Sequence, residues 1–115
     1  MLLYRFMKSG QILPIPKMIS YGEKIIEYCH GYDTYGSFSQ NSMLMEACVF
    51  NLSQIGELTK KLDDSFIAQY ADIPWSQLRG LRNRIVHDYE GVNLVLVWDI
   101  IHEDLPELIV KLKNL

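Results

Sequence analysis

Broad positive charge and long apolar runs are both missing from this chain. Its 115 residues carry a formal net charge of −3 and include only four arginines. A protein that coats nucleic acid needs a broad basic surface to displace counterions, so this charge argues against that class. No apolar run reaches the roughly 18 residues that a membrane span needs, and residues 1–6 are too short and too broken by charge for a secretory signal. We therefore expect a cytoplasmic protein with no membrane segment.

Cysteine is also scarce, since Cys29 and Cys48 are the only two. The sequence contains no CxxC pair and no cluster of cysteine with histidine, so it indicates neither a zinc site nor a disulfide framework. A reduced setting fits this usage best. We expect no metal and no cofactor.

Apolar residues, at 49% of the composition, recur at helical spacing along most of the chain. Residues 1–16 lack this period and contain Gly10, Pro14 and Pro16, so we expect an irregular N-terminal arm there; a true start at Met7 is an alternative. Residues 17–115 are long enough to form one helical domain.

Within this domain the spacing predicts a series of helices joined by short connections. We expect an amphipathic helix over 17–29 that is capped by Gly31, followed by a loop over 32–39. A long helix over 40–62, whose Met43 and Met45 fill the core, leads into a short helical turn over 63–70. A further helix runs from Pro74 to about His87, and a last helix over 93–112 is capped by Asn93. Pro106 predicts a kink or restart, helped by a capping box between Asp104 and Glu107. No strand pattern competes, so the fold class is all-α.

One basic cluster stands out against the acidic background. Arg79, Arg82 and Arg84 fall within six residues, and His87 and Tyr89 follow at once. Guanidinium groups bind phosphate as planar forks and histidine moves protons near neutral pH, which suggests a phosphodiester site. Plainer interpretations stay open: solvated arginines on a helix surface, a histidine that caps a helix end, and a tyrosine that packs.

Helical geometry restricts how this cluster can converge. Residues five apart differ by about 140° around an ideal helix, so Arg82 and His87 would not share a face, whereas Asn83 and His87 would. Convergence of Arg82 with His87 therefore needs the helix to loosen near His87, or a second subunit to bring its own copy. Both routes favour a site at a helix end or at a dimer seam.

The run from Arg82 to Tyr89 resembles the Arg-(four residues)-His-x-Tyr motif of HepT-like toxins in the HEPN superfamily of helical ribonucleases. The order and spacing of further pieces between residues 17 and 112 agree with it: Ile55-Gly56-Glu57, Ile73-Pro74-Trp75, Gly80-Leu81-Arg82-Asn83 and Val97-Trp98-Asp99. The resemblance implies an antiparallel bundle of four to five helices that forms a homodimer, with the motifs of both subunits facing one cleft.

The resemblance also implies a function and a role for each residue of the motif. Such proteins act as metal-independent endoribonuclease toxins encoded beside a minimal nucleotidyltransferase (MNT) antitoxin, with which they can form higher assemblies. Arg82 and His87 match the catalytic pair, Asn83 the supporting polar position, and Tyr89 the tyrosine that the antitoxin modifies with AMP.

Two assignments stay open at this stage. Arg79 and Arg84 are predicted to contact the RNA backbone. The rival function is a non-catalytic nucleotide- or partner-binding subunit of a minimal nucleotidyltransferase complex, in which the same arginines only hold phosphate or protein. A third possibility is a purely structural helical dimer.

Overall fold

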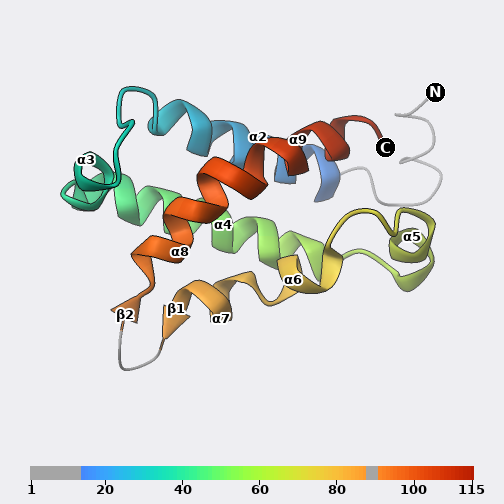
Figure 1. The fold of residues 1–115 in the computed structure, drawn as a ribbon. Coiled ribbons are helices and arrows are strands. Elements are labelled where there is room, and N and C mark those ends of the chain that lie inside the picture. The colour runs from blue at the N-terminus through green and yellow to red at the C-terminus, as the bar shows by residue number, and fades with distance from the viewer. Residues whose placement is uncertain (1–13, 88–90) are drawn as a thin grey trace.

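The computed structural model describes residues 14–87 and 91–115, and these are mostly helical (Figure 1). The longest elements are α2 (Pro14–Tyr28), α4 (Ser42–Thr59) and a C-terminal run formed by α8 (Leu94–Asp99), a π-helical turn (Ile100–Asp104) and α9 (Leu105–Lys113). Successive runs point in opposite directions, and α4 contacts both α2 and the short helices that follow it (Figure 1). The all-α prediction is confirmed. Within the described ranges, no helix has the length and apolar character to cross a membrane.

The first helix begins earlier than the sequence predicts. α2 starts at Pro14, and both Pro14 and Ile15 are buried. Residues 14–16 therefore belong to the helix and not to the arm that we expected over 1–16, because a proline needs no amide partner in a first turn and Ile15 continues the apolar stripe. The rest of the expected arm lies outside the described residues. The predicted end is confirmed, since Gly31 has a φ of 88°, which favours glycine.

A short helix replaces most of the loop expected over residues 32–39. α3 (Tyr35–Ser39) begins at a capping box in which the side chains of Thr34 and Ser37 each accept from the other's backbone N–H. Such reciprocal bonds satisfy two of the free donors at a helix start. Phe38 holds the helix in place, since it is fully buried and its ring centroid lies 5.4 Å from that of Trp98. The small polar residues that suggested a loop are in fact caps.

α4 is the helix around which the others pack. It begins where the Asn41 side chain accepts from the Leu44 N–H at 3.0 Å, and it buries the predicted stripe from Leu44 to Leu58. At Gly56 the helix approaches α6 (Trp75–Arg79) so closely that an added Cβ would lie 2.7 Å from the Leu78 carbonyl oxygen. A glycine is required here for packing, because any side chain would push the two backbones apart.

The C-terminal run stays helical across Pro106, but by a different device from the one predicted. Asn93 caps it as expected, accepting from the Leu96 N–H at 3.1 Å. The Asp104 side chain makes no capping hydrogen bond, so the predicted capping box with Glu107 is wrong. Instead the Leu105 N–H donates to the Ile100 carbonyl in the π-helical turn. A π turn widens the helix just before the proline, whose ring and missing donor would otherwise break it.

Candidate active site

The helix expected from Pro74 to about His87 is divided in two. α6 (Trp75–Arg79) and α7 (Leu81–Ile85) meet at Gly80, which ends the first and precedes the second. Pro74 lies just before α6 and not within its first turn. Leu81 and Ile85 are buried, and α7 contacts α4. These two anchors turn the residues between them, Arg82 to Arg84, toward solvent.

α7 then ends before His87, and the chain becomes extended. Val86 has φ −117° and ψ 118°, and it begins β1 (Val86–His87), which pairs antiparallel with β2 (Gly91–Val92). His87 lies opposite Gly91 in this ladder. The expectation that no strand forms is therefore wrong, because two residues on each side are too few to show an alternating pattern in the sequence.

A backbone hydrogen bond holds the paired strands β1 and β2 against the end of α7. The Asn93 N–H donates to the Ile85 carbonyl at 2.8 Å, directly beyond the pairing of Val86 with Val92. Gly91, with φ 80°, supplies the conformation that the chain needs on the return. The angular objection to a meeting of Arg82 with His87 assumed a continuous helix, and the end of α7 at Ile85 removes it. Of His87 the structure describes the backbone, and Tyr89 lies outside the described residues.

Arg82 and Asn83 are polar residues of α7 that stay open to a ligand, as does Arg84. Both are exposed, and neither side chain forms a hydrogen bond or ion pair within residues 14–87 and 91–115. A guanidinium with no partner among the described residues has its five donors available for a phosphate. These two sequence-predicted residues therefore sit together at the helix that leads directly into the strand bearing His87.

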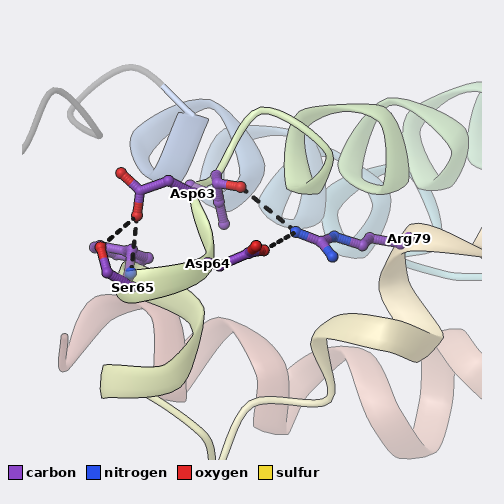
Figure 2. A network of polar contacts seen from close by, with 6 residues as sticks. Asp63, Asp64, Ser65 and Arg79 are labelled. Atoms are coloured by element: carbon purple, nitrogen blue, oxygen red, sulfur yellow. Dashed lines mark hydrogen bonds and ion pairs between the residues drawn. The ribbon is translucent and has the colours of Figure 1, made fainter.

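Arg79 instead faces the corner between α4 and α5 (Asp64–Gln69), as Figure 2 shows. Its Nη2 donates to the Leu62 carbonyl at 3.4 Å and lies 4.0 Å from the Asp64 carboxylate. The Asp64 side chain is fully exposed, so this ion pair is worth little, and the bond to the carbonyl contributes more. Arg79 thereby ties α6 to the end of α4, and any contact with RNA stays a prediction.

The Asp63 side chain caps the N-terminus of α5, as the Asp63-Asp64 pair predicted. Its carboxylate accepts from the Phe66 N–H and from the Ser65 hydroxyl, both at 2.9 Å (Figure 2). These bonds, first the one to the backbone, lower the pKa of Asp63 because they favour its charged form. The capped turn therefore helps to hold in place the Leu62 carbonyl that accepts from Arg79.

Arg84 has a different environment from that of Arg79. It lines a cavity of about 110 Å³ between α4, α6, α7 and the C-terminal run, whose other lining residues include Leu52, Leu78 and Asp104. Arg79, Arg82 and Arg84, which are close in sequence, thus differ in what their side chains contact. A role for Arg84 in RNA contact stays a prediction.

An apolar surface adjoins the hairpin, and the sequence did not reveal it. Met45, Val49 and Phe50 of α4 line a hollow of about 410 Å³ together with Val92 of β2 and Leu94 of α8; we call these five residues the α4–β2 patch. Phe50 is 57% exposed. Large apolar groups left open beside a polar site commonly mark an interface.

The expectation for Met43 is overturned at the same helix. Met43 is 80% exposed, so it does not fill the core as predicted. Both Met43 and Phe50 lie off the buried stripe of α4, and a strongly apolar helix gave no contrast by which to tell its inner from its outer side.

Comparison with known proteins identifies the family to which the chain is similar. Residues 18–115 match the family model described as "Ribonuclease HepT-like". The chain is 33% identical to "Putative RNase MJ1380" of Methanocaldococcus jannaschii over 73% of this chain and 76% of that protein. It is 32% identical to "Putative RNase TTE0752" of Caldanaerobacter subterraneus over 81% of this chain and 82% of that protein. No solved structure matches it.

Another relative carries the family's own name. "Probable ribonuclease HepT" of Thermococcus cleftensis is 32% identical over 60% of this chain and 63% of that protein. The resemblance predicted from the motif is confirmed by these matches, and they support endoribonuclease activity.

The different contacts of Arg79 and Arg84 lead to a prediction about the free energy of unfolding. Arg79→Ala should lower the free energy of unfolding by about 1 kcal/mol, because it removes the donor to the Leu62 carbonyl. Arg84→Ala, which breaks no hydrogen bond or ion pair to a described residue, should change it by no more than about 0.5 kcal/mol. Urea unfolding of both variants measures the difference. Equal losses would contradict the assignment of Arg79 to the α4–α5 corner.

Proposed function

Because the chain belongs to the HepT-like ribonuclease family, we propose that it is the toxin of a HepT/MNT-type toxin–antitoxin pair. In this proposal it is a metal-independent endoribonuclease that uses Arg82 and His87. The observation that carries it is the end of α7 at Ile85, after which an extended hairpin holds the backbone of His87 beyond the exposed Arg82. A helix end of this kind is what the motif's spacing required for the two residues to converge.

The proposed reaction uses the RNA's own 2′-hydroxyl as the nucleophile. A histidine takes the 2′-hydroxyl proton as the 2′-oxygen bonds to phosphorus, the bond to the 5′-oxygen breaks, and that oxygen receives a proton. The products are a 2′,3′-cyclic phosphate and a 5′-hydroxyl. Arg82 stabilises the charge that grows on the phosphoryl oxygens. Asn83 orients the imidazole or holds a phosphate.

Two copies of the chain would complete this site in a homodimer. One histidine would then act as base and the other as acid across a shared cleft. The α4–β2 patch supports this arrangement, because Val92 lies in the strand paired with the one that contains His87, so a subunit seated on the patch lies beside the motif. An interface with an apolar centre and a polar rim is typical of stable subunit contacts.

The first prediction from this proposal concerns catalysis. The purified chain, freed of antitoxin, should cleave RNA in the presence of EDTA and leave 2′,3′-cyclic phosphate ends. His87→Ala should lower the rate by about 10²–10⁴, the usual worth of a general acid or base. Rates on a labelled RNA, with product ends identified by mass spectrometry, measure both effects.

The matched control is His30→Ala, since His30 is exposed and lies beyond the end of α2. It should leave the rate unchanged. Equal cleavage by the wild type and His87→Ala would end the catalytic assignment, and 3′-hydroxyl products would exclude the mechanism. Growth arrest on expression that His87→Ala relieves, with folding intact, would exclude the non-catalytic binding subunit.

The second prediction concerns the dimer. Phe50→Asp should convert a dimer to monomers and reduce RNA cleavage with it, because a charge in an apolar interface loses its hydration. Val110→Asp is the matched control, as Val110 is 58% exposed on α9 against 57% for Phe50. Light scattering and the cleavage assay measure both properties. A dimer that survives Phe50→Asp would contradict the role of the α4–β2 patch.

The third prediction concerns control of the toxin. Made together with its cognate nucleotidyltransferase, the chain should gain mass in multiples of one AMP, and Tyr89→Phe should abolish the gain. Tyr28→Phe, at an exposed tyrosine of α2, should retain it. Added bulk and negative charge on the motif would block RNA entry. An unmodified Tyr89 under these conditions would instead favour neutralisation by occlusion.

A further inference from the structure

The fold brings together the only two cysteines of the chain, which the sequence keeps far apart. Cys29 follows the end of α2, Cys48 lies within α4, and 19 positions separate them. Their Sγ atoms are 3.6 Å apart, and both are free thiols. Because α2 and α4 pack side by side along their length, the two thiols face each other across a helix interface.

The two thiols are not equivalent. Cys29 is 8% exposed at a helix end, whereas Cys48 is completely buried. The hydrogen bond from the Cys48 thiol lowers the pKa of Cys29, because it stabilises the thiolate. The same bond raises the pKa of Cys48, and burial raises it further. Cys29 is therefore the more accessible and the more acidic of the two thiols, and Cys48 lies buried beside it.

We propose that Cys29 and Cys48 are a modification site, at which peroxide drives a reversible intramolecular disulfide. The Cys29 thiolate attacks one oxygen of hydrogen peroxide, forms a sulfenic acid and releases hydroxide. The Cys48 sulfur then attacks the sulfur of that sulfenic acid, and its proton leaves with the hydroxyl group as water. The two electrons lost by the thiols reduce the O–O bond, and a dithiol reductant reverses the reaction.

The bond would tie a corner that supports the α8 end of the molecule. The segment between the cysteines includes α3, whose Phe38 and Tyr35 rings lie 5.4 Å and 6.0 Å from the Trp98 ring in α8. α8 in turn follows directly on β2 and Asn93. Closing this loop restricts the unfolded chain, so the oxidised protein should unfold at a temperature on the order of 10 °C higher.

The experiment treats the full chain with hydrogen peroxide and measures intact mass after alkylation. The wild type should lose two hydrogen atoms and take up no alkylating agent until dithiothreitol restores two reactive thiols. Cys48→Ser should stop at the Cys29 sulfenic acid, which dimedone traps. Cys29→Ser should stay reduced at Cys48, because the oxidant cannot reach a completely buried thiol.

Three results would overturn the proposal: two free thiols in the wild type after peroxide, a disulfide that links two chains, or oxidation of Cys29→Ser as fast as the wild type. The wild-type mass is decisive even if a serine variant fails to fold. An unfolding temperature that oxidation leaves unchanged would overturn the claim that the bond ties the α3 corner. None of these measurements depends on Arg82 or His87, so they are separate from the test of ribonuclease activity.

Discussion

The close approach of α4 and α6 at Gly56 sets the position of everything that follows in the chain. Because a Cβ there would lie 2.7 Å from the Leu78 carbonyl oxygen, the two backbones touch without an intervening side chain. That contact holds α6 against the C-terminal part of α4, and α7 starts after a break at Gly80. The buried anchors Leu81 and Ile85 complete the placement, and they leave Arg82 facing solvent.

The early end of α7 is what makes the motif geometrically useful. A continuous helix would separate Arg82 and His87 by about 140° around its axis. The backbone bond from Asn93 to Ile85 and the short β1–β2 ladder replace the last turn with extended chain. This short ladder shortens the helix only slightly, but it changes the direction of the chain after Ile85. Catalytic residues are often carried on such irregular segments beside a rigid scaffold.

Much of the helical framework was predictable because its signals are local. Apolar spacing identified the main helices, and Asn93, Asp63 and Gly31 cap or end helices where their chemistry predicted. The failures occurred where distant contacts decide. The π turn before Pro106 replaced the expected capping box. Met43 was wrongly expected in the core, because a strongly apolar helix gives little contrast between its inner and outer sides.

By itself the sequence determined the fold class, the family and the identity of the motif residues, since helical period and motif spacing are properties of order along the chain. Only the tertiary structure decided which of those residues share surroundings. It placed Arg79 at the α4–α5 corner and left Arg82 and Arg84 exposed, with Arg84 at the edge of a cavity, and it brought Cys29 beside Cys48. The physical reason is that direction and distance between side chains depend on where helices end and on how closely their backbones pack.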